Sequence, residues 1–166
     1  KDRVAPPPVK SPVPPFPPQG LDEAGIERHI PDTGRAATRA MQAGYDGVEV
    51  MGSEGYFLNQ FLVTHTNRRT DRWGGAYGNR MLLPVEGVRR DRAAIGPKAI
   101  LIFRISLVDL VPDGSSWDEV NRLAKAIEAA GGAFPHTGVG WHGARGPTVS
   151  TSAPRAPFSG PTPPVR

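Results

Sequence analysis

The chain has 166 residues, about the length of one domain, and carries 20 basic and 16 acidic side chains. The positive excess lies at the two ends, because residues 21–145 hold 15 basic and 15 acidic side chains, so no basic face for nucleic acid is expected. Cysteine is absent, which excludes disulfides and thiolate metal sites, and we predict no metal site. No apolar run reaches about 18 residues, so we predict no membrane span and a cytoplasmic location.

Proline divides the chain in the same way. Of 19 prolines, eight lie in residues 1–20 and six in residues 146–166. We therefore predict a Pro-rich disordered segment over 1–20, a folded domain over 21–155 and a Pro-rich tail over 156–166. The amino-terminal prolines include P-x-x-P spacing, so a peptide ligand for an SH3-type partner is one alternative function.

The middle of the chain repeats one arrangement three times, in which a charged, helix-periodic stretch ends at a glycine and a short apolar run follows. The first predicted helix begins near Thr33, because Pro31 and Gly34 interrupt its pattern. The others cover 80–95 and 117–130, the last capped by Ser116. The apolar runs predict buried parallel strands at 46–51, 99–105 and 133–138.

Alternating helices and strands define an α/β fold with a parallel sheet. A doubly wound sheet and a (β/α)₈ barrel both fit this alternation. The glycines after the first strand, Gly52 and Gly55, match neither of the common nucleotide-binding patterns. Three strands cannot close a barrel, which needs roughly 250 residues. If the fold is a barrel, the chain therefore forms only part of it, a partial TIM (β/α)₈ barrel of about three consecutive β/α units.

Catalytic residues of barrels lie at the carboxyl ends of the strands. One such residue stands at or just after each predicted strand: Tyr56, Arg104 and His142. The Tyr56 phenol can donate a proton, and the Arg104 guanidinium can hold an anion. The His142 imidazole can take either role. The structural alternatives are a packing tyrosine, an Arg104–Asp109 ion pair and a hydrogen-bonded structural histidine. Three arginines of the first loop fit a solvated loop better than a phosphate clamp: Arg68, Arg69 and Arg72.

Several separated motifs resemble the 2,4-dienoyl-CoA reductase branch of the old yellow enzyme (NADH:flavin oxidoreductase) family. They cover residues 43–56, 59–62, 66–75, 79–81, 103–104 and 140–142. The resemblance runs in register from about residue 36 to about residue 155. It implies a barrel that holds FMN at the strand carboxyl ends. It also implies reduction of a conjugated dienoyl-CoA thioester with electrons from NADPH.

The resemblance assigns roles by motif match. Tyr56 is the proton donor, His142 assists it, and Arg104 contacts the flavin. Two segments match the acyl-CoA site: His65, Thr66, Asn67 and Arg68, and then Gly143, Ala144 and Arg145. Met51 and Glu54 stand where the wider family binds a ketone oxygen, which favours the dienoyl-CoA branch over enone reductases.

The sequence also departs from the family pattern. Gly143 replaces an acidic residue, and Pro135 and His136 replace an apolar–Asn pair. The FAD region and iron–sulfur cluster of longer members are not encoded here, and the missing barrel strands would have to come from elsewhere. We therefore expect the isolated chain to be marginally stable, inactive and weak in FMN binding. The alternative to a reductase is a catalytically incompetent fragment of one.

Overall fold

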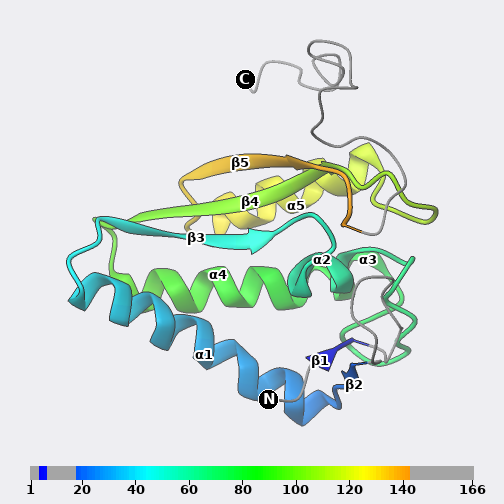
Figure 1. Ribbon diagram of the computed structural model, residues 1–166, viewed down its shortest axis with the longest axis horizontal. Helices are drawn as coiled ribbons and strands as arrows, with labels where there is room; N and C mark the ends of the chain where they lie inside the picture. Colours follow the sequence, from blue (N-terminus) through cyan, green and yellow to red (C-terminus); the bar gives the residue numbers. More distant parts are fainter. Residues whose placement is uncertain (1–3, 7–17, 143–166) are drawn as a thin grey trace.

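The computed structural model describes residues 4–6 and 18–142. Its centre is a three-stranded parallel sheet in the order β3-β4-β5, formed by Gly47–Gly52, Ile100–Val108 and Phe134–Val139 (Figure 1). The predicted parallel strands are therefore confirmed, each within a few residues of its expected bounds. Their carboxyl ends lie at one edge of the sheet, on the right in Figure 1.

Three long helices precede the three strands, and two short ones follow β3. The five helices are α1 (Glu23–Gln42), α2 (Phe57–Leu62), α3 (Tyr77–Arg80), α4 (Leu82–Ile95) and α5 (Trp117–Ala129). Ser116 caps α5 as predicted, since its hydroxyl accepts from the Glu119 amide and the Glu119 carboxylate accepts from the Ser116 amide. No helix in the described residues is long and apolar enough to cross a membrane.

The predicted start of the first helix near Thr33 is wrong. The helix begins ten residues earlier, at Glu23, where the Asp22 carboxylate accepts a hydrogen bond of 2.6 Å from the Gly25 amide. Ile26, in the first two turns, is fully buried. Pro31 lies on the exposed side of the helix. Capping and burial of the early turns thus offset the one backbone hydrogen bond that proline removes.

The amino-terminal segment differs from the expected absence of regular structure. Val4–Ala5 (β1) pairs in parallel with Gln19–Gly20 (β2), and the Leu21 amide extends this ladder to the Ala5 carbonyl. These positions lack proline, so they keep the amide donors that pairing needs. The rest of the segment and the predicted tail over 156–166 lie outside the described residues.

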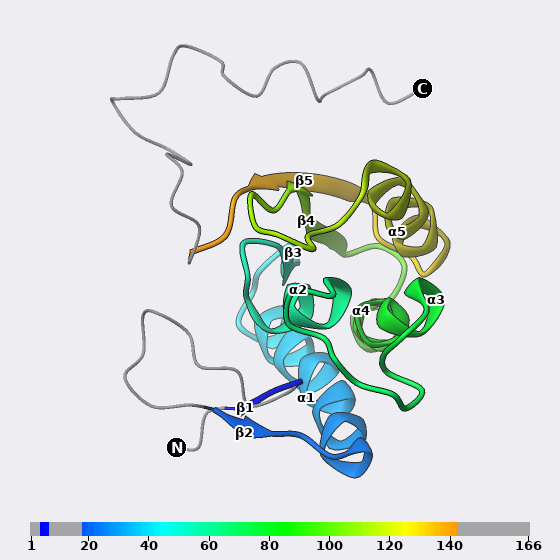
Figure 2. The same ribbon diagram turned by 90° about the vertical axis from the view of Figure 1, so that its right-hand side faces the viewer.

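The helices all cover one face of the sheet (Figure 2). Leu101, Phe103 and Ile105 point from β4 into this helix layer and are buried, among a core that includes Phe61 and Trp73. The alternate residues of each strand point to the opposite face, which carries no helix in the described part of the chain. That face and the carboxyl edge beside it hold the polar side chains of the candidate site.

Candidate active site

The loop that follows β3 is held by side chains of α2. The Gly55 amide donates to Asn59 Oδ1 at 2.8 Å, and Gln60 Nε2 donates to the Gly55 carbonyl at 2.8 Å. Gly55 has φ +80°, and a Cβ there would lie 2.4 Å from the Trp141 ring. Only glycine permits this backbone conformation with the ring so close. The loop therefore places Tyr56 at the carboxyl edge of the sheet, directly before α2.

Tyr56 and His142 meet although they follow different strands. Their ring centroids are 5.4 Å apart, and the Tyr56 side chain is half exposed. His142 Nδ1 lies 2.8 Å from the Glu54 carbonyl oxygen. A carbonyl only accepts, so Nδ1 carries the proton of this contact and Nε2 is the nitrogen left for other chemistry. The buried Trp141 ring stacks beside His142 with centroids 6.2 Å apart.

Arg104 is paired with Glu54, not with Asp109 as the structural alternative held. Arg104 Nη2 lies 2.9 Å from Glu54 Oε1. Asp109 instead accepts from the Ser115 amide at 2.7 Å, because it follows the irregularity between Ser106 and Val108 and turns toward its own loop. Arg104 Nε is buried and has no hydrogen-bond partner among the described residues. The guanidinium therefore keeps donor capacity for a ligand on the helix-free face.

Sequence reasoning missed two features of this site. Glu54 joins Arg104 through its carboxylate and His142 through its carbonyl, so it links all three strand ends. His136 lies in register with Arg104, and its Nδ1 is 2.8 Å from Glu49 Oε2. The His136–Glu49 contact could have been suspected from the sequence, because His136 departs from the family pattern. The role of Glu54 could not, because the strand register decides that Arg104 is its partner.

The predicted acyl-CoA segment is only partly available to a ligand. Asn67 is buried, and its Nδ2 donates to the carbonyls of Phe61 and Trp73 at 2.7 and 2.8 Å. Thr66 donates to the Gln60 carbonyl at 2.7 Å. Both side chains thus hold the loop, and Asn67 has no donor left for a substrate. In this structure the Asn67 side chain therefore supports the loop beside the predicted substrate site.

The other predicted substrate residues have different surroundings. The His65 ring meets Trp141 edge to face, with centroids 5.8 Å apart, beside the Tyr56–His142 pair. Arg68 is exposed and forms an ion pair of 3.3 Å with Asp113. Three predicted residues lie outside the described part of the chain: Gly143, Ala144 and Arg145.

Each arginine of the predicted solvated loop has a carboxylate partner. Arg69 pairs with Asp71 and lowers the pKa of that carboxyl through the hydrogen bond between them. Arg72 pairs with Glu27 at 3.4 Å and lies over the Trp73 ring. Arg68 and Arg72 are exposed, as a solvated loop requires, whereas the Arg69 side chain is largely buried and also donates to the carbonyls of Pro6 and Leu21. With all three guanidinium groups paired to carboxylates, the structure does not favour a phosphate clamp.

Asn67→Ala should lower the free energy of unfolding by about 2–4 kcal/mol, because it leaves two buried carbonyls and the Arg69 amide without their partner. Urea unfolding followed by circular dichroism measures this loss. Asn79→Ala is the matched control, since Asn79 is exposed, and should change stability by less than about 0.5 kcal/mol. An equal, small effect of both changes would contradict the structural assignment of Asn67.

Comparison with solved structures identifies the fold as part of a TIM barrel of the old yellow enzyme type. A 2-naphthoyl-CoA reductase complex is 32% identical with a TM-score of 0.81, over 87% of this chain and 22% of that chain. The old yellow enzyme homologue from Zymomonas mobilis is 28% identical with a TM-score of 0.76, over 84% and 42%. The predicted fold class is confirmed.

Sequence comparison then defines the family. Residues 5–162 match the model of the NADH:flavin oxidoreductase / NADH oxidase family, and the chain belongs to this family. A metal reductase of Desulforamulus reducens is 36% identical over 94% of this chain, and an NADH oxidase of Thermoanaerobacter brockii is 37% identical over 82%. The chain spans 23% and 21% of the length of these two relatives.

Proposed function

We propose that this chain is the central part of an FMN-dependent reductase that reduces a conjugated 2,4-dienoyl-CoA thioester with electrons from NADPH. The observation that carries the proposal is the meeting of Tyr56 and His142 beside the Glu54–Arg104 pair. The likeness to a 2-naphthoyl-CoA reductase supports a conjugated acyl-CoA as the substrate class.

Among the described residues, the Arg104 guanidinium is the group suited to contact FMN. Arg104 has a buried Nε without a partner and projects to the helix-free face of the sheet, so it suits a planar ligand with acceptor atoms. Glu54 holds the guanidinium in place through Nη2 and leaves Nε available. When bound, FMN would supply the hydride for one end of the conjugated system. Arg104 would then orient the ring over the sheet.

The proton for the other end would come from Tyr56. Its side chain is half exposed at the site, and its phenol hydroxyl is a hydrogen-bond donor. The His142 ring lies beside the phenol, and its Nε2 has no hydrogen-bond partner among the described residues, so it can assist the transfer or return a proton to Tyr56. The two-electron reduction then balances as one hydride and one proton added to the diene.

Substrate preference in a complete protein that contains this chain tests the proposal. NADPH oxidation should be faster with 2,4-hexadienoyl-CoA than with 2-cyclohexenone, by at least about tenfold in kcat/KM. Bound FMN is measured separately by flavin absorbance after denaturation. Preference for the enone would refute the dienoyl-CoA branch while leaving the flavoprotein family intact. A protein that contains all the barrel strands and holds no flavin would favour the incompetent alternative.

A further inference from the structure

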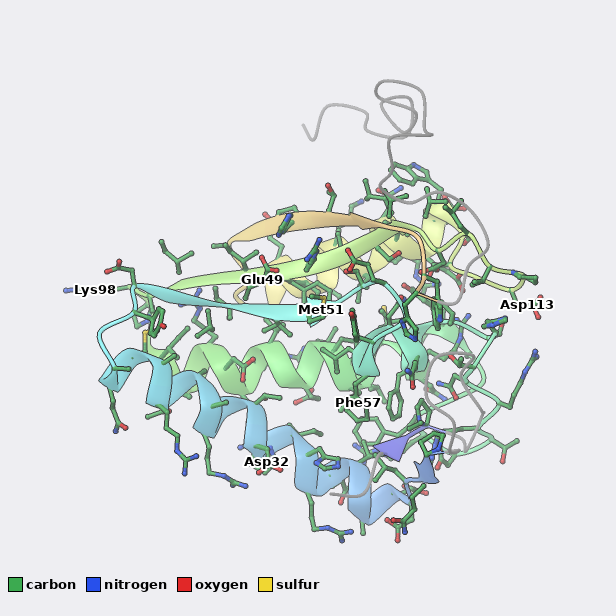
Figure 3. The ribbon with its side chains drawn as sticks, in the orientation of Figure 1. Asp32, Glu49, Met51, Phe57, Lys98 and Asp113 are labelled. Atoms are coloured by element: carbon green, nitrogen blue, oxygen red, sulfur yellow. The ribbon has the colours of Figure 1, made fainter. Side chains whose placement is uncertain are left out.

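One side-chain contact on the helix-free face of the sheet reaches over a whole strand. His136 Nδ1 of β5 lies 2.8 Å from Glu49 Oε2 of β3, although β4 runs between these two strands. Neighbouring strands are about 4.8 Å apart, so the two backbones are separated by about 10 Å across the sheet. The two side chains therefore meet above β4. We call this contact the Glu49–His136 bridge, and Figure 3 labels Glu49 on β3.

The strand register places the bridge directly beside Arg104. Glu49 lies in register with Ile102 of β4, and His136 lies in register with Arg104. The bridge therefore crosses β4 between Ile102 and Arg104. Both of these residues alternate with the β4 residues that point into the helix layer, so their side chains share the helix-free face with the bridge. The bridge thus borders the Arg104 side chain on the side nearer the amino end of the strand.

A second carboxylate holds Arg104 from the opposite direction. Glu54 follows β3 at the carboxyl edge of the sheet, and its Oε1 lies 2.9 Å from Arg104 Nη2. Gly138 of β5 leaves room for this carboxylate, since a Cβ there would lie 3.0 Å from Glu54 Oε1. The guanidinium is thus held toward the candidate active site. Its Nε is buried and has no hydrogen-bond partner among the described residues.

Glu49 is able to compete for this guanidinium. It is the diagonal neighbour of Arg104 on the adjacent strand, with the two backbones about 8 Å apart, a separation that long side chains span together. In the structure Glu49 instead accepts a hydrogen bond from His136 Nδ1, because a carboxylate only accepts. Carboxylates form strong, charge-assisted hydrogen bonds with guanidinium groups. Without His136, Glu49 would therefore turn to Arg104 and take its Nε donor.

We propose that His136 is a positioning residue for Arg104: it occupies the Glu49 carboxylate and so keeps the Arg104 Nε donor free for an acceptor atom of FMN. This role rests on the proposed function, since FMN is the ligand expected at Arg104. The effect of His136 passes through Glu49 and needs no contact between the imidazole and the flavin. Loss of the imidazole is therefore harmful to flavin binding only while Glu49 keeps its negative charge.

FMN affinity in a complete protein that contains this chain tests the role, measured by flavin fluorescence during titration of the apoprotein. His136→Ala should weaken binding at least about tenfold, the effect of losing one hydrogen bond from a charged donor. Adding Glu49→Gln to His136→Ala should restore the affinity to within about threefold, because a neutral amide competes poorly for a guanidinium. His136→Asn should retain the affinity, since its amide keeps an N–H donor at the δ position. His29→Ala, which removes a histidine from its pair with Asp32 on α1, is the matched control and should change nothing.

A second measurement uses the 166-residue chain without flavin. The NMR signal of the Arg104 Nε–H group, assigned with Arg104→Lys, should shift in His136→Ala and return when Glu49→Gln is added. Unchanged FMN affinity in His136→Ala would overturn the proposal. An equal loss in His136→Ala and in the double variant would also overturn it, because the bridge would then be a structural support only. A complete protein that binds no FMN would refute the proposed function instead, and the Nε–H signal would still decide whether Glu49 captures Arg104.

Discussion

Replacing Tyr56 with phenylalanine in a complete reductase that carries these residues should slow reduction of a 2,4-dienoyl-CoA by about 10²–10⁴-fold, the usual effect of a positioned general acid. Flavin content and the rate of flavin reduction by NADPH should stay the same, because neither needs the phenol proton. Stopped-flow measurement of the two half-reactions separates these effects. Phenylalanine keeps the ring contact with His142, so the change removes only the hydroxyl.

The matched control for this experiment is Tyr45→Phe. Tyr45 is 68% exposed and precedes β3, at the opposite end of the sheet from Tyr56, so both half-reactions should be unchanged. Equal slowing of both half-reactions in Tyr56→Phe would make Tyr56 a flavin-positioning residue. Unchanged rates in both would make it a packing residue, and either result would refute the assignment of the acid.

Gly55→Ala should destabilise the protein by about 2–6 kcal/mol, through a strained backbone together with overpacking. The new Cβ would lie 2.4 Å from the Trp141 ring, at a residue with φ +80°. Because Trp141 stacks beside His142, the change should also move the histidine away from Tyr56. Thermal unfolding gives the loss of stability, and tryptophan fluorescence reports the displacement.

Gly44→Ala separates strain from collision. Gly44 has φ +89° and nothing within 4 Å of an added Cβ, so it carries the backbone cost alone. That cost should be about 1–2 kcal/mol. The difference between the two variants then measures the contact with Trp141. Equal losses would show that the close approach of Gly55 to the ring does not constrain the site.

The local pattern of the sequence was sufficient for the α/β class and for the three strands. Helix periodicity, a glycine stop and a short apolar run each depend on neighbouring residues, and the three strands and the helices before β4 and β5 formed at nearly the expected positions. Ser116 capped its helix for the same reason, since both partners lie within one turn. The motifs also placed Tyr56 and His142 at strand ends that the parallel sheet brings together.

Local rules failed where distant packing decided the outcome. Pro31 predicted a late helix start, but an Asp22 cap and a buried Ile26 stabilise the turns before it. The two short helices α2 and α3 lack a long periodic pattern, so only tertiary contacts define them. Asn67 matched a substrate segment in sequence, yet the carbonyls around it take both of its amide donors.

The sequence by itself determined which residues form strands and which polar side chains stand at their ends. Only the tertiary structure decided how those side chains pair: Glu54 with Arg104, and Glu49 with His136. It also placed the second of these contacts across β4, beside Arg104. The physical reason is the distance along the chain over which each kind of contact acts. Secondary structure follows from contacts within a few residues, whereas the partner of a charged group depends on strand register and helix packing between segments far apart in the chain.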